Sequence, residues 1–284
     1  MAGEMKPRSI EKEIIIDAPV EAVWKALTDA EEITNWFQPQ AEVKPGKGGF
    51  IRAIWGEDQD WTSPIDEWKP NEHLRLVYVE ATPPEMKDKT PFFIPFRVAV
   101  DYYLKSRGGQ TVLRLVHSGL SPEASWDNQY DGTIRGWNFE LGGLQYYLEH
   151  HRGKKRRIAH AKADITGIAV GDAWSRMFGP DGLLASGSID GASPGDALNC
   201  QTTSGDHLHG EITIIKPPND LAAILTNHGS SYLRVRIDEA SFMQPQAEAN
   251  LWLSAFGVDE KQVKSLQARW QKMLDDLFAN SAAA

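Results

Sequence analysis

The sequence predicts an α+β protein made of two tandem domains, each a curved antiparallel sheet wrapped around one long C-terminal helix. Three observations lead to this prediction. In each half of the chain, runs of alternating apolar and polar residues follow one another with few helices between them. An amphipathic helix pattern follows each series of strands, around Trp137 and around Trp270. Short motifs of the first half also recur, in the same order, in the second half.

The composition is that of a folded chain with two domains of ordinary size. Of its 284 residues, 41% are hydrophobic and 24% are charged, and the formal net charge is −9. An acidic chain lacks the cationic face that a nucleic-acid backbone requires, so we expect no nucleic-acid partner. Cys200 is the single cysteine, which excludes an internal disulfide and a cysteine zinc cage. The polar residues 1–9 and the lack of a long apolar run predict no signal peptide and no membrane span, and hence a cytoplasmic protein.

The first domain is expected over residues 8–152. Asp17 and Pro19 are suitable residues to begin a helix directly after the first strand. The long helix that closes the domain would cover the concave side of the sheet. The predicted strands are 10–16, 50–55, 61–68, 74–79, 97–104 and 111–117, the short helices begin at residues 20 and 30, and the apolar face of the long helix is Trp137, Leu141, Leu144 and Leu148.

Four motifs of the first half recur in the second half. Each match is weak alone, because short apolar patterns recur by chance, but their common order indicates a duplication. The pairs are 20–24 (VEAVW) with 170–174 (VGDAW), Pro45-Gly46 with Pro194-Gly195, 68–70 (WKP) with 215–217 (IKP), and Trp137, Leu141 and Leu144 with Trp270, Leu274 and Leu277.

The second domain is expected over residues 158–280, after a charged linker at residues 152–157. The separation between matched motifs decreases along the chain, so we expect this copy to have lost about one strand and most of the aromatic residues. Asp259 and Gln262 would form a capping box for its last helix. We therefore expect a packed partner domain.

The first half resembles the START-like superfamily, which is also known as SRPBCC or helix-grip. Residues 14–27 (IIIDAPVEAVWKAL) are similar to its opening motif. Trp36-Phe37, 48–50 (GGF), 67–70 (EWKP) and Gly136-Trp137 are similar to one branch, the activators of heat shock protein 90 ATPase. The resemblance implies a helix-grip fold with an apolar cavity. It does not imply one activity, since the superfamily includes lipid carriers, hormone receptors, polyketide cyclases and a chaperone activator.

Strand alternation and the resemblance together predict an apolar ligand cavity in the first domain. The alternative is that the same side chains pack against one another as an ordinary core. Which of Phe50 and Trp55 points inward depends on the strand register, and the polar loop at residues 82–91 is expected at the cavity mouth. The candidate lining residues are Trp36, Phe37, Phe50, Trp55, Leu76, Tyr78, Val98, Val100, Tyr102, Leu113, Leu115, His117, Trp137, Leu141 and Leu144.

His117 is the candidate polar group of this cavity. A histidine there could orient a ligand or move a proton, although a structural histidine is the alternative. No catalytic residue is assigned. His207 and His209 share one face of a strand but lack a third ligand at a suitable spacing, so we expect no metal site and no cofactor.

The resulting hypothesis is a non-enzymatic protein that binds a small hydrophobic molecule in its first domain. The first alternative is a protein-interaction role resembling chaperone ATPase activation, with a protein partner. The second is a cyclase-like or hydrolytic enzyme that uses His117 and the cavity tyrosines. A homodimer is compatible with each of these hypotheses.

Overall fold

The computed structural model describes residues 6–56, 59–79, 97–241 and 246–279. The chain forms two compact units. The first unit consists of Met1–Tyr130 and Glu140–Gly153, and the second of Asp131–Phe139 and Lys154–Ala284. The segment Asp131–Phe139, which the sequence places in the first domain, thus packs with the second unit.

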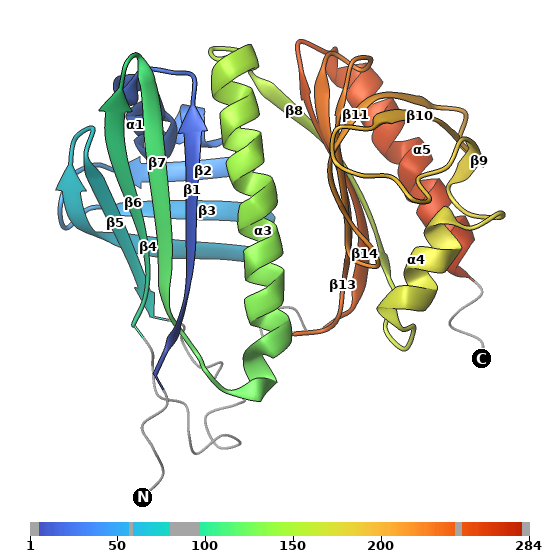
Figure 1. Cartoon of the computed structure of the whole chain (residues 1–284), viewed down its shortest axis with the longest axis horizontal. Helices are drawn as coiled ribbons and strands as arrows, with labels where there is room; N and C mark the ends of the chain where they lie inside the picture. The colour runs from blue at the N-terminus through green and yellow to red at the C-terminus, as the bar shows by residue number, and fades with distance from the viewer. Residues whose placement is uncertain (1–5, 57–58, 80–96, 242–245, 280–284) are drawn as a thin grey trace, which may run out of the picture. The chain divides into compact units, whose positions relative to one another are not determined.

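The first unit is a seven-stranded antiparallel sheet with two short helices after its first strand and one long helix after its last (Figure 1). The sheet order is β1-β7-β6-β5-β4-β3-β2, so the first strand pairs with the last and the remaining strands follow as a meander. The elements are β1 (Arg8–Ile16), α1 (Val20–Thr28), α2 (Ala30–Ile33), β2 (Gln40–Lys44), β3 (Phe50–Gly56), β4 (Gln59–Lys69), β5 (His73–Val79), β6 (Arg97–Arg107), β7 (Gln110–Leu120) and α3 (Asp127–Tyr146), which a π-helical turn (Tyr147–His151) extends.

The second unit repeats this order of strands. Its sheet runs β8-β14-β13-β12-β11-β10-β9, which is the order of the first sheet copied strand for strand. This identity of topology confirms the duplication predicted from four short motifs. The elements are β8 (Arg156–Asp164), α4 (Val170–Phe178), β9 (Leu184–Ser186), β10 (Ala197–Thr202), β11 (His207–Lys216), β12 (Asp220–Leu225), β13 (Ser231–Asp238), β14 (Glu248–Phe256) and α5 (Glu260–Phe278).

The expectation that the second copy had lost a strand was wrong. Both sheets have seven strands. Two edge elements lack the alternating apolar pattern that marks the other strands. β2 is largely polar and alternates only between exposed and partly buried positions, whereas β9 has three residues and precedes a run rich in glycine, serine and aspartate. Their pairing with a neighbouring strand, and not their own hydrophobicity, makes them strands.

Each long helix satisfies backbone groups on the free side of an edge strand. In the first unit, the Tyr130 hydroxyl donates to Ser9 O (3.0 Å) and Gln145 Nε2 donates to Ile15 O (3.2 Å), both on β1. In the second unit, Gln271 bonds both the N–H and the C=O of Lys162 on β8. Unpaired edge groups invite pairing with another chain, so these side chains protect both sheets.

Helix capping differs from the sequence-based expectation at both starts. At α5, Asp259 is the N-cap as expected, but its carboxylate accepts from Lys261 N (2.8 Å). At α1, Pro19 is the N-cap and no side chain caps the helix. Asp17 has another role, because its backbone N–H donates to Glu149 Oε1 (2.9 Å) and so ties the end of β1 to the end of the long helix.

The two long helices approach their edge strands to different extents. The inward face of β8 carries Ala159 and Ala161, both fully buried, and the backbone of α5 runs close alongside this strand. At the corresponding positions β1 carries Ile10, Lys12 and Ile14. In the described part of the chain, the backbone of α3 does not come as close to β1 as the backbone of α5 comes to β8. Small side chains permit close packing, whereas longer ones keep a helix away from the sheet.

A buried ion-pair network holds the segment Asp131–Phe139 within the second unit. Arg135 donates to Asp220 (2.8 Å) and to Asp238 (2.7 Å), and the side chains of both acids are 6% exposed. Arg234 also donates to Asp220 (3.0 Å), and its guanidinium lies 4.6 Å from the Phe139 ring centre. Burial alone lowers the pKa of Arg135, but the two aspartates outweigh this effect and raise it. Breaking such a pair would leave a buried charge without its counterion, at a high cost in free energy. The network therefore holds this part of α3 in place.

The cap of α5 can be tested directly. Asp259→Ala should lower the free energy of unfolding of the second unit by about 1 kcal/mol, because the Lys261 N–H loses the carboxylate to which it donates. Urea denaturation followed by circular dichroism measures this loss. Asp276→Ala is the matched control, because it removes the same carboxylate from an exposed pair with Lys272 in the same helix and should cost much less. Equal losses would contradict the capping role.

Candidate ligand-binding interior

The concave face of the first sheet is built from cross-strand rows of buried residues. One row places Ile10, His117, Val100 and Leu76 side by side on four neighbouring strands. The next row contains Leu115 and Tyr102 in the same way, and then Leu74 and Trp68. Leu74 and Leu115 are fully buried, and Tyr102 and His117 are 4% and 5% exposed. Lys12 of β1 is opposite Leu115, so these rows form a wall that is apolar except for Tyr102, His117 and, at its edge, Lys12.

The strand register also shows on which face of the sheet Phe50 and Trp55 lie. On β3, Trp55 shares a face with the buried Ile51 and Ala53, and Phe50 is on the opposite face. The side chain of Tyr78 and the loop at residues 82–91 lie outside the described residues. Trp137 belongs to the segment of α3 that packs with the second unit. Of the candidate lining residues, those that are buried are Trp36, Val98, Val100, Tyr102, Leu113, Leu115, His117, Trp137, Leu141 and Leu144, and those that are partly buried are Phe37, Phe50, Trp55 and Leu76.

A chain of aromatic rings lies beside this wall. Trp36 stacks on Phe37 with ring centres 5.0 Å apart, and Phe37 meets Trp55 edge-on at 5.6 Å. Trp55 in turn lies 6.4 Å from Trp61, which is 42% exposed. The indole N–H of Trp36 donates to Ala26 O (2.8 Å), which anchors the buried end of the chain. The rings therefore extend from the core to the surface as one apolar path.

Burial shifts the pKa values of the two polar side chains that strands β6 and β7 place on the concave face, Tyr102 and His117. Burial raises the pKa of Tyr102, and the nearby Glu140 of α3 raises it further, so the phenol keeps its proton. Burial lowers the pKa of His117 to about 4, so its imidazole is neutral at neutral pH. The sequence reasoning missed Glu140. Glu140 is three residues after Trp137 and four before Leu144, so helical periodicity places it beside the apolar face of the helix. This spacing could have predicted that Glu140 lies near the cavity candidates.

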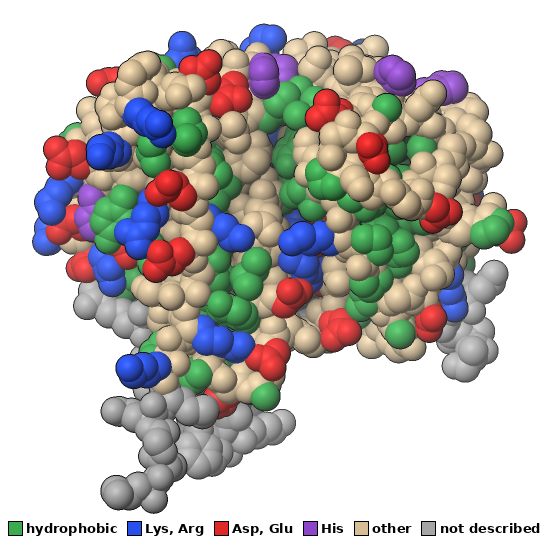
Figure 2. All heavy atoms as spheres, viewed as in Figure 1, with side chains coloured by type: hydrophobic (Ala, Val, Ile, Leu, Met, Phe, Trp, Pro, Cys, Tyr) green, Lys and Arg blue, Asp and Glu red, His purple; other side chains and the backbone are tan. Residues whose placement is uncertain are grey.

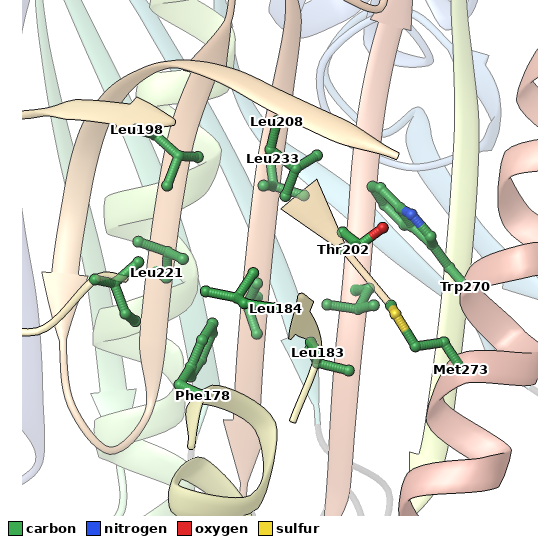
Figure 3. Close-up of a pocket in the computed structure, with 13 residues that line it drawn as sticks. Phe178, Leu183, Leu184, Leu198, Thr202, Leu208, Leu221, Leu233, Trp270 and Met273 are labelled. Carbon is green, nitrogen blue, oxygen red and sulfur yellow. The ribbon is translucent and has the colours of Figure 1, made fainter. Parts of the chain in front are cut away.

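The second unit contains a small apolar cavity between its sheet and α5 (Figure 3). Its volume is about 30 Å³, and Leu221, Leu233, Leu251 and Met273 are among the residues that line it. Trp270 also lines it and is 1% exposed, and within the described residues its indole Nε1 has no hydrogen-bond partner. Such a volume holds a molecule of about the size of water, because a benzene-sized guest needs roughly 150 Å³.

A wider groove lies at the first half of α5, also within the second unit. Its volume is about 710 Å³, and it is lined by the end of β14, the turn at His228 and Gly229, and α5 from Lys261 to Arg269. The sequence did not indicate this groove because its walls come from three segments that pair only in the folded chain.

Neither a metal site nor a membrane-spanning helix is found among the described residues. Within them, no group of three or more His, Cys, Asp and Glu side chains is arranged to hold a metal ion. No helix in the described part of the chain is long and apolar enough to cross a membrane. Positive and negative side chains are interspersed on the face that Figure 2 shows, which is not the continuous cationic surface of a nucleic-acid-binding protein.

The model of the family described as activator of Hsp90 ATPase homolog 1-like protein matches residues 17–149. The first unit belongs to this family. The chain therefore joins an activator of Hsp90 ATPase homolog 1-like domain, with its START-like helix-grip fold, to a second copy of the same strand order. The family model ends at residue 149, before the first strand of the second sheet, as expected for a copy that has diverged.

Comparison with solved structures gives further similar proteins. Protein MLL2253 from Mesorhizobium loti is 25% identical, with 51% of this chain and 98% of that protein covered and a TM-score of 0.43. The Aha1 dimer from Colwellia psychrerythraea is 18% identical over 51% of this chain and 99% of that protein, with a TM-score of 0.43. DynU16, a putative protein in the dynemicin biosynthetic locus, is 17% identical over 96% of this chain and 98% of that protein, with a TM-score of 0.41. No curated protein matched the chain.

The pKa of His117 makes stability depend on pH. The folded-state pKa is about 4 and the ordinary value is 6.5, so the unfolded chain binds the extra proton between these two values. Stability should therefore fall as the pH drops from about 6.5 to about 4, by on the order of 3 kcal/mol from this residue. Urea denaturation at a series of pH values measures the slope. His117→Gln removes the titrating group, and a slope unchanged in this variant would contradict the buried neutral histidine.

Proposed function

We propose that the first unit binds a small hydrophobic molecule on the concave face of its sheet. The observation that carries the proposal is the spacing between helix and sheet. Ile10, Lys12 and Ile14 stand on the inward face of β1, where the second unit has alanines, and α3 makes no close backbone approach to β1 within the described residues. A helix held away from a wall of apolar side chains leaves volume that an apolar ligand can fill.

The polar groups of the wall define the chemistry of the ligand. A protonated Tyr102 can donate a hydrogen bond, and a neutral His117 has one donor and one acceptor nitrogen. Burial of apolar surface would supply most of the affinity, and these groups would orient one or two polar atoms of the ligand. The proposed ligand is thus a mostly apolar molecule that carries a hydroxyl or carbonyl group.

Binding accounts for these residues better than catalysis does. An efficient general base has a pKa near the working pH, whereas the pKa of His117 is about 4. A base that holds its proton so weakly removes little of the barrier of a proton transfer at neutral pH. The cyclase-like or hydrolytic alternative would therefore need a group other than His117.

The binding site can be tested by filling it. Leu115→Trp should weaken binding of the neutral apolar dye Nile red by about tenfold or more, because the larger side chain occupies the proposed volume. Val116→Trp is the matched control, since Val116 is the next residue on β7 and points to the other face of the sheet. Dye fluorescence titration measures affinity, and native mass spectrometry of the purified protein tests for a co-purified ligand that Leu115→Trp removes. If the two variants bind the dye equally, the dye does not occupy the concave face of the first unit.

The family description favours one alternative, which is activation of a chaperone ATPase through a protein interaction. The working surface would then be the outer face of the first sheet. There Tyr103 is 38% exposed and stacks on His73, which bonds the buried Asp101 (2.7 Å). A rise in the ATPase rate of an Hsp90-class chaperone on addition of the ligand-free protein, lost in Tyr103→Ala, would support this alternative.

The homodimer remains a prediction, and the solved dimer named above is a property of the Colwellia protein.

A further inference from the structure

The groove of the second unit has the size of a ligand site. Its volume of about 710 Å³ lies in the range of roughly 300–1,000 Å³ that small-molecule sites occupy. All of its lining residues belong to the second unit, so it does not depend on the concave face of the first.

The lining of the groove is apolar at its floor. Leu253 and Ala255 of β14 are fully buried, and Val263 and Leu266 of α5 are 4% and 3% exposed. These side chains belong to the core of the second unit, and the partly exposed Val258 packs against them and presents the apolar lining at the surface. An aliphatic or aromatic group laid on this surface would gain affinity by leaving water.

One rim of the groove is cationic. Lys261, Ser265 and Arg269 follow one another at intervals of four residues along α5, so they form one polar stripe beside the apolar face of the helix. None of the lining residues of the groove is acidic. Within the described part of the chain, the Lys261 ammonium makes no hydrogen bond and no ion pair. It is therefore a positive charge that is available to a ligand.

Arg269 is held in one position and still has donors available. It is paired with Asp206, with Nη2 at 2.5 Å from Oδ1 and Nε at 3.2 Å, and its Nη1 donates to Ser265 Oγ (2.8 Å). A guanidinium has five N–H groups. Among the described residues, one N–H on each terminal nitrogen remains without an acceptor. Two donors on neighbouring nitrogens suit a carboxylate, and the fixed side chain loses little conformational entropy on binding.

From these features we infer that the second unit binds a small amphipathic carboxylate, with the acid group at Lys261 and Arg269 and the apolar part on the floor of the groove. The site is distinct from the one proposed for the first unit in both place and chemistry. The first site offers a protonated phenol and a neutral imidazole to an uncharged molecule, whereas this groove offers an anion the unpaired charge of Lys261 and the remaining N–H donors of Arg269, whose own charge is shared with Asp206.

Decanoate is a suitable probe, titrated calorimetrically into the full chain. We expect one charge-dependent site, and Lys261→Gln should weaken binding about 3- to 10-fold. Arg269→Lys keeps the positive charge but removes the guanidinium fork, so it should also weaken decanoate binding. The thermal unfolding of each variant is measured in parallel. Lys264→Gln is the matched control, because it removes the same charge from the same helix outside the groove and should leave the affinity unchanged.

Two further measurements separate this site from the first. Decanol, which has the same apolar chain and no charge, should bind more weakly than decanoate and should be insensitive to Lys261→Gln. Leu115→Trp in the first unit should leave decanoate binding intact. The inference is overturned if decanoate does not bind, or if Lys261→Gln behaves as Lys264→Gln does. It is equally overturned if Leu115→Trp alone abolishes binding, because decanoate would then occupy the first unit.

Discussion

The structure depends on one constraint, which is that a single helix must cover the concave face of a seven-stranded sheet. The strand order of each unit brings its first and last strands together at one edge, and the long helix follows directly from the last strand. The helix has a narrow apolar stripe and the sheet is several strands wide. Part of the concave face is therefore left to short helices, large side chains or open volume. Both hollows of the second unit are lined by α5 together with strands of its sheet.

The two units meet this constraint with different side chains. In the second unit, alanines on β8 let α5 approach closely, and Trp270 fills most of the space beyond it. In the first unit, longer side chains on β1 hold α3 away, and the helix reaches the edge strand through Tyr130 and Gln145. Duplication has thus kept the topology, which the backbone hydrogen bonds determine, while the size of the inward-facing residues changed the helix position. The size of a few inward-facing side chains thus affects how closely the long helix packs on its sheet.

Much of the fold could be predicted from the sequence because its signals are local. Alternation marked the strands of the first sheet, and helical spacing marked the long helices. The missed strands β2 and β9 carry no such pattern, since edge strands need bury neither face completely. The choice between Phe50 and Trp55, the packing of Asp131–Phe139 with the second unit and the groove beside α5 all depend on segments distant in sequence. No local pattern records which distant strand or helix a residue will meet.

The interior polar groups show why one topology can serve two chemistries. Burial keeps Tyr102 and His117 uncharged, because it removes the water that would solvate an ionised group. Arg269 can remain charged because Asp206 and solvent both stabilise it, and its side chain is 42% exposed. The proposed site of the first unit thus presents neutral polar groups, and the proposed groove of the second unit presents a cation.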